Sequence, residues 1–124
     1  MGTIKTTKDM SLNLTINLAE GIILYDDMST WITEYYSGTV TNLILWDFRE
    51  ADLSKIKTEE FAELARLIKR KADLRQGGKT ALVFKRDLEF GLGRMFEVFS
   101  ELEDLSFEFM SFRSIEEARE WLGV

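Results

Sequence analysis

The chain has 124 residues, 45% of them hydrophobic, and its 22 acidic and 16 basic residues give a formal net charge of −6. This length supports one hydrophobic core rather than two, and the negative charge argues against binding nucleic acid or anionic membranes through bulk charge. The sequence contains neither cysteine nor histidine, which excludes disulfides, thiolate metal sites, cysteine nucleophiles and histidine-dependent triads.

The N-terminal segment is polar and lacks a periodic pattern. We therefore expect residues 1–9 to be a frayed extension and residues 10–124 to form a single domain. Residues 1–10 lack the apolar core of a secretory signal, and no window approaches 18 consecutive apolar residues. The sequence thus predicts no stable membrane insertion, and a cytoplasmic location is the default.

Two strands are expected next. Apolar and polar residues alternate from Leu12 to Leu18, as in an edge strand with one solvated face. A short turn at residues 19–21 leads into the apolar run of residues 22–25, which is typical of a strand covered on both faces. We predict that these two runs form a hairpin.

Helices and strands then alternate. Asp27 or Ser29 can cap a helix that ends at Gly38, and Thr58 can cap a second helix with an apolar face running to Ala72. Buried strands are predicted at residues 43–46 and 81–84. A third helix has an inner face between Leu92 and Leu102, and Gly77 is expected to stop the second helix.

The chain ends in a strand followed by a capped helix. Apolar residues between Phe107 and Phe112 lead into Ser114, and Glu117 stands three residues on, which is the spacing of a capping box. The order becomes β-β-α-β-α-β-α-β-α. We expect an α/β fold with a mixed, mainly parallel sheet and an N-terminal hairpin.

This order resembles that of the SpoIIAA-like (STAS-like) family of small bacterial α/β proteins. The segments FGLGRMF at residues 90–96 and FRSIEEAREWL at residues 112–122 are similar to parts of that family. The resemblance implies a SpoIIAA-like fold and a non-catalytic protein-interaction or regulatory module. It also allows self-association, including a homodimer.

One departure from the wider superfamily concerns phosphorylation. Its anti-sigma-factor antagonists carry an Asp-Ser-Ser/Thr-Gly phosphoacceptor motif where this chain has residues 55–60, KIKTEE. Thr58 is the one hydroxyl there and is the candidate phosphosite, although a role as helix cap explains it fully. Glu59 and Glu60 would repel an added phosphate, so we favour the structural role.

An alternative function is binding of a small apolar or anionic, lipid-like ligand between the first helix, the third helix and the sheet. The candidate lining residues are Trp31, Tyr35, Phe90 and Arg94. Arg94 and free amides at a helix start near residues 91–93 would receive an anionic group. Close helix–sheet packing explains the two glycines, Gly91 and Gly93, at least as well as a phosphate loop does.

Polar residues after the buried runs form another candidate set. Asp26, Asp27, Asp47 and Lys85 superficially match the acidic pair, phosphoacceptor and lysine of a magnesium-dependent receiver domain. The initial hairpin and the smaller number of crossovers argue against this interpretation. We therefore predict no metal, no cofactor and no catalytic residues, since acids, lysines and tyrosines alone supply no recognisable catalytic motif.

The last feature is a basic segment. Half of the chain's 16 basic residues lie between Arg66 and Arg86, where only Asp73 opposes them. They favour either a surface for an acidic partner or, as we prefer, solvated cations near a helix C-terminus. Arg75 belongs to this set.

Overall fold

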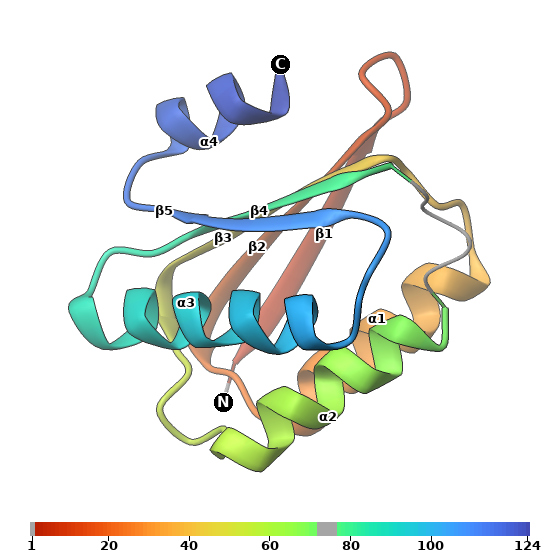
Figure 1. The fold of residues 1–124 in the computed structure, drawn as a ribbon. Helices are drawn as coiled ribbons and strands as arrows, with labels where there is room; N and C mark the ends of the chain where they lie inside the picture. Colours follow the sequence, from red (N-terminus) through yellow and green to blue (C-terminus); the bar gives the residue numbers. More distant parts are fainter. Residues whose placement is uncertain (1, 72–76) are drawn as a thin grey trace.

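A computed structural model describes residues 2–71 and 77–124 of the chain. Nine elements follow one another along it: β1 (Thr3–Asp9), β2 (Leu14–Ile22), α1 (Tyr25–Ser37), β3 (Leu43–Asp52), α2 (Thr58–Lys69), β4 (Lys79–Val83), α3 (Asp87–Leu102), β5 (Glu108–Phe112) and α4 (Ile115–Leu122). Figure 1 shows α1, α2 and α3 on one face of the sheet and α4 on the other. The predicted element order is confirmed.

The five strands form one sheet in the order β1-β2-β3-β4-β5. β1 is antiparallel to β2, and every other neighbouring pair is parallel. The parallel pairs follow from the crossover helices α1, α2 and α3. Each helix returns the chain to the end of the sheet at which the previous strand began. The predicted mixed, mainly parallel sheet is therefore confirmed.

The central strand β3 is buried on both faces, and its side chains alternate between two cores. Ile44, Trp46 and Phe48 pack in the core beneath α1–α3. Leu45 belongs to a smaller core beneath α4, together with Leu14, Ala81, Val83, Ala118 and Leu122. The two-residue period of a strand thus divides β3 between the two layers of helices.

The expected frayed extension at residues 1–9 is wrong for residues 3–9. Thr3–Asp9 is β1, which pairs with β2 from Thr3 opposite Glu20 to Asp9 opposite Leu14. The strand is mostly exposed and polar, so it lacks the alternation of apolar and polar residues from which strands are predicted. Asn13, with φ of 53°, makes the left-handed turn that joins the two strands.

The hairpin therefore lies further toward the N-terminus than predicted. Residues 14–22 form the one strand β2, and the run at residues 22–25 is not a second strand, because Tyr25 already begins α1. Gly21 has φ of 79° and sits beside a register shift between Leu18 and Glu20. Its freedom permits an irregularity inside a strand, where the sequence suggested a turn.

Helix starts also differ from expectation at two of the predicted caps. Leu24 precedes α1 and donates its backbone N–H to the Asp27 carboxylate at 2.8 Å. Lys57, not Thr58, is the cap residue of α2, and Glu60 accepts its N–H at 2.8 Å. The predicted position of Ala72 on this helix lies outside the described residues.

The C-terminal helix starts as the sequence predicts. Ser114 Oγ accepts the Glu117 N–H at 3.1 Å and donates to the Glu117 carboxylate at 3.2 Å. Gly123, with φ of 83°, ends α4 in the left-handed conformation.

The third helix begins at Asp87, so Gly91 and Gly93 lie within it rather than at its start. A Cβ atom on Gly93 would lie 2.6 Å from Phe84 Cζ and 2.7 Å from Ser111 Oγ. Gly93 thus permits α3 to lie close to β4 and β5. A Cβ on Gly91 would meet nothing within 4 Å.

Gly93→Ala is expected to lower the free energy of unfolding by about 1–3 kcal/mol, because the added methyl overpacks the contact with the buried Phe84 ring. Gly91→Ala is the matched control in the same helix and should raise stability by up to about 1 kcal/mol. Urea denaturation followed by circular dichroism measures both. Equal stability of the two variants would contradict the assigned role of Gly93.

Candidate functional site

An apolar cavity of about 70 Å³ lies between the sheet and the helices α1, α2 and α3. The sheet provides its floor and the three helices its walls. The lining residues are Met28, Trp31, Ile32, Tyr36, Ile44, Trp46, Phe48, Leu53, Ile56, Phe61, Leu64, Ile68, Thr80, Leu82, Phe84, Leu92, Gly93, Phe96 and Phe109.

The floor carries a row of aromatic rings. Trp46 stacks on Phe48 with ring centroids 5.0 Å apart, and Phe48 stacks on Phe84 at 5.4 Å. Trp46 and Phe48 belong to β3, and Phe84 directly follows the neighbouring strand β4. The parallel pairing of the two strands aligns the rings. Large planar side chains of fixed orientation give the cavity a rigid apolar base.

Trp31 of α1 closes one side of the cavity and is held by a polar chain. Its Nε1 donates to Thr6 Oγ1 at 2.9 Å, and Thr6 Oγ1 donates to Asn17 Oδ1 at 2.8 Å. Its ring packs edge-on against Trp46 at 4.7 Å. The unexpected strand β1 therefore contributes to the site, because it supplies Thr6.

The chemistry of this cavity is limited to apolar contact. Its lining includes hydroxyls from Thr80 and Tyr36, and none of the described side chains around it is charged. An apolar cavity of about 150 Å³ in another protein stays dry and binds benzene. The smaller free volume here suits a smaller apolar molecule unless the helices move apart.

The four ligand-binding residues predicted from the sequence do not come together. Trp31 lines the cavity. Tyr35 stacks behind Trp31 at 4.7 Å, and its hydroxyl accepts the Thr41 N–H at 2.7 Å. It therefore stands behind the cavity lining rather than in it.

Phe90 and Arg94 lie away from the cavity lining. The Phe90 ring packs under the Arg113 guanidinium at 4.3 Å. The Arg94 side chain is 65% exposed, and its Nε lies 3.7 Å from Glu97 Oε2. Because α3 begins at Asp87, the amides at residues 91–93 lie inside the helix and form no terminal anion site.

The candidate phosphosite Thr58 is the first residue of α2 and is exposed. Its hydroxyl is not the cap of the helix, so the structural role expected for it is wrong. Glu59 and Glu60 follow it in the first turn. Phosphorylation of Thr58 stays a prediction.

The polar residues expected at the strand ends are not gathered into one site. β3 continues to Asp52, so Asp47 lies within the strand, whereas Asp26 and Asp27 lie in the first turn of α1. Lys85 Nζ lies 3.9 Å from Glu50 Oε1. In the described part of the chain, no group of three or more acidic side chains could hold a metal ion.

An ion pair between the buried Glu89 and the exposed Arg86 ties α3 to the end of β3. Glu89 is 1% exposed and accepts hydrogen bonds from Arg86 Nε at 3.0 Å and from the Leu53 N–H at 3.3 Å. Arg86 also donates to the Ala51 carbonyl at 2.9 Å. These contacts satisfy the charges within the fold, so the pair has a structural role.

The basic segment is likewise engaged within the fold. Lys69 donates to the Asp104 carbonyl at 3.0 Å, Lys79 donates to the Trp121 carbonyl at 3.0 Å, and Arg66 pairs with Glu63. Arg75 lies outside the described residues. The described members thus favour the structural interpretation over a continuous surface for an acidic partner.

Asp47 and Arg49 form a pair on the opposite face of the sheet. Two hydrogen bonds of 2.9 Å run from the Arg49 guanidinium to the Asp47 carboxylate, and the Arg49 N–H donates a third at 3.1 Å. Burial raises the pKa of the Asp47 carboxyl, but the hydrogen bonds and charge of Arg49 outweigh it and hold that pKa below its ordinary 3.8.

Comparison with known proteins identifies the fold class. No family model matches the chain, and no curated protein matches it. A crystal structure of an uncharacterized protein from the DUF3478 family, with a SpoIIAA-like fold, from Shewanella loihica PV-4 is similar over 98% of this chain and 93% of that one. The TM-score is 0.60 and the sequence identity 16%. The chain therefore has a SpoIIAA-like fold, as its sequence suggested.

Within residues 2–71 and 77–124, none of the helices has the length and apolar composition needed to cross a membrane.

Asp47→Asn is expected to lower the free energy of unfolding at pH 6 by about 1 kcal/mol, because it removes a charge-assisted pair that is partly exposed. The folded-state pKa of Asp47 is depressed, so its contribution is present above pH 3.8 and is lost as the pH falls through the folded pKa. The parent and the variant should therefore converge in stability at a pH below 3.8, once the Asp47 carboxyl is protonated in the folded state as well.

Urea unfolding between pH 2.5 and 7 measures this difference. Glu63→Gln, which breaks the exposed Arg66–Glu63 pair, is the control and should change stability by less than about 0.5 kcal/mol. A gap between parent and Asp47→Asn that is independent of pH would contradict the assignment.

Proposed function

We propose that this protein is a non-catalytic binding module that takes a small apolar ligand in the cavity beneath α1–α3. The observation that carries the proposal is the lining of that cavity, in which aromatic and aliphatic side chains surround about 70 Å³ of free volume. Well-packed interiors contain few voids larger than a water molecule, so unfilled space beside rigid rings is typical of a ligand site.

The types of residue around the cavity support binding without catalysis. The described lining contains no acidic or basic side chain that could transfer a proton. Such a cavity selects a ligand by size and apolarity. An anionic group would be costly there, because it would be buried without a counter-charge.

A protein-interaction role is the second candidate, and an exposed apolar stripe on α3 favours it. Leu88, Val98 and Leu102 are 56%, 52% and 75% exposed. Gly91 and the half-buried Met95 continue the line at spacings of three and four residues, as in a helix that packs against another helix. The open space around Gly91 permits a close approach.

The occupant that we propose for this stripe is a second copy of the chain, with the two α3 helices antiparallel. Arg94 and Glu101 flank the stripe on the same side, because they are seven residues apart. In an antiparallel pair, Arg94 of each copy would face Glu101 of the other, and Leu102 would face Gly91. A symmetric pair uses the same contacts twice, so this charge complementarity supports a homodimer.

A saturable change in tryptophan fluorescence under increasing xenon pressure is expected, because Trp31 and Trp46 line the cavity and xenon is smaller than benzene. Ile44→Phe and Leu92→Phe each place added volume into the cavity and should weaken xenon binding at least tenfold. Ile16→Phe is the matched control on the opposite face of the sheet and should bind like the parent.

Two outcomes would contradict the ligand proposal. One is a linear response without saturation. The other is binding that survives both cavity-filling variants while circular dichroism shows them to be folded. Native mass spectrometry of protein purified under mild conditions provides an independent measurement, in which added mass that Ile44→Phe removes would support the proposal.

For the dimer, analytical ultracentrifugation of the parent is expected to show an average mass that rises with concentration toward twice the monomer mass. Val98→Glu places a charge in the middle of the stripe and should keep the protein monomeric at every concentration. Leu24→Glu changes a residue of similar exposure elsewhere and is the control. A parent that stays monomeric at millimolar concentration would exclude the dimer.

A further inference from the structure

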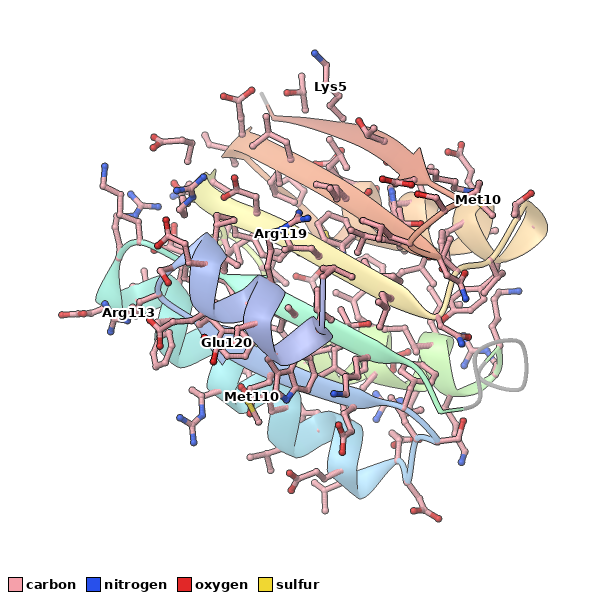
Figure 2. All side chains as sticks on the ribbon, turned by 90° about the horizontal axis from the view of Figure 1, so that it is seen from above. Lys5, Met10, Met110, Arg113, Arg119 and Glu120 are labelled. Atoms are coloured by element: carbon pink, nitrogen blue, oxygen red, sulfur yellow. The ribbon has the colours of Figure 1, made fainter. Side chains whose placement is uncertain are left out.

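The face of the sheet that carries α4 is only partly covered. α4 has eight residues and contacts β3, β4 and β5. Figure 2 shows β1 and β2 beside α4, where the helix does not cover them. A hollow of about 340 Å³ lies there, between the side of α4 and the surface of the sheet.

This hollow, which we call the α4 groove, combines an apolar floor with charged sides. Ile16, Leu18 and Leu45 form the floor, and Ile115 of α4 adds an apolar wall. Ile16, Leu18 and Ile115 are half-buried, so they remain available for contact. The other lining residues are Lys5, Thr7, Asp47, Arg49 and Arg119.

The charges that line the α4 groove are three cations and one anion. Asp47 is the anion, and the two hydrogen bonds from the Arg49 guanidinium occupy it. Within the described residues, the side chains of Lys5 and Arg119 make neither a hydrogen bond nor an ion pair. From outside the lining, Asp9 interacts electrostatically with Arg119, and Glu116 with Arg49.

Lys5 and Arg119 stand on opposite sides of the floor. Figure 2 shows Arg119 projecting from α4 over the sheet and Lys5 at the edge formed by β1. The Arg119 guanidinium offers a planar donor surface for an oxyanion, whereas the Lys5 ammonium ends a flexible stem. Two uncommitted cations on one hollow contrast with the net charge of −6 of the whole chain.

We propose that the α4 groove binds a small amphiphile with an oxyanion head, which Arg119 contacts and Lys5 supports, and with a short apolar body on Ile16, Leu18 and Ile115. The volume matches the lower range of small-molecule sites. Charge complementarity selects the anionic head, and the exposed apolar floor selects the body. This site is separate from the cavity beneath α1–α3, which lies on the other face of the sheet and has no cation among its described lining residues.

The test uses octanoate and octyl phosphate as probes, with octanol as the neutral analogue and acetate as the head alone. Titration followed by ¹⁵N–¹H correlation spectra is expected to give saturable shifts for amides of β1, β2 and α4. Octanol and acetate should each bind at least tenfold more weakly than octanoate, because each lacks one half of the recognised chemistry. Of the two anions, the one that binds more tightly identifies the head group as a carboxylate or a phosphate.

Lys5→Gln and Arg119→Gln are expected to weaken octanoate binding about threefold and about tenfold, respectively. Lys55→Gln removes an exposed cation outside the groove and is the matched control, which should bind like the parent. Ile44→Phe fills the cavity on the other face and should leave octanoate binding unchanged, so failure of this proposal is distinguishable from failure of the proposed function.

Three results would overturn the proposal: octanoate shifts confined to α1–α3, equal affinities for octanol and octanoate, or folded Lys5→Gln and Arg119→Gln variants that bind like the parent. Unsaturated shifts up to 50 mM octanoate, at constant ionic strength, would overturn it as well. Added salt should weaken octanoate binding to the parent and to Lys55→Gln but not to Lys5→Gln or Arg119→Gln, and this result would support the proposal. The reason is that salt screens the attraction between octanoate and the cations of the groove.

Discussion

The burial of β3 on both faces is the constraint on which the rest of the structure depends. Its alternate side chains contribute to two different surfaces. Trp46 and Phe48 line the apolar cavity, while Leu45 and Asp47 line the α4 groove. A shift of β3 by one residue would exchange the two sets, because successive side chains of a strand point to opposite faces. The register of β3 with its neighbours therefore fixes the character of both candidate sites.

Polar ties at the edges of the apolar layer hold the helices over this strand. Glu89 and Arg86 join the start of α3 to the end of β3, and Trp31 reaches β1 and β2 through Thr6 and Asn17. These ties fix α1 and α3 from outside the cavity and leave its lining apolar. The separation explains how a domain with many charged residues encloses a cavity whose described lining residues are all uncharged.

The sequence predicted elements whose signal is local and missed those whose signal is not. Ser114 and Glu117 stand at the spacing of a helix cap, and the structure confirms that Ser114 Oγ accepts the Glu117 N–H. The strand Thr3–Asp9 was not predicted, because its exposed polar residues form a strand only through pairing with β2. Gly21 was predicted to lie in a turn, because glycine adopts the positive φ that both turns and β-bulges require. Only the pairing of β2 with β3 shows that it lies beside an irregularity within a strand.

By itself, the sequence determined the order of strands and helices and the lack of histidine and cysteine chemistry, because composition and periodicity act along the chain; the SpoIIAA-like fold was implied by its resemblance to a known family. Only the tertiary structure decided which side chains meet. Trp31 lies in the cavity lining, whereas the Phe90 ring packs outside it against Phe84 and Arg113, and the Arg94 side chain is exposed. Lys5 and Arg119, at opposite ends of the chain, border one groove because β1 joins the sheet and α4 folds back over it.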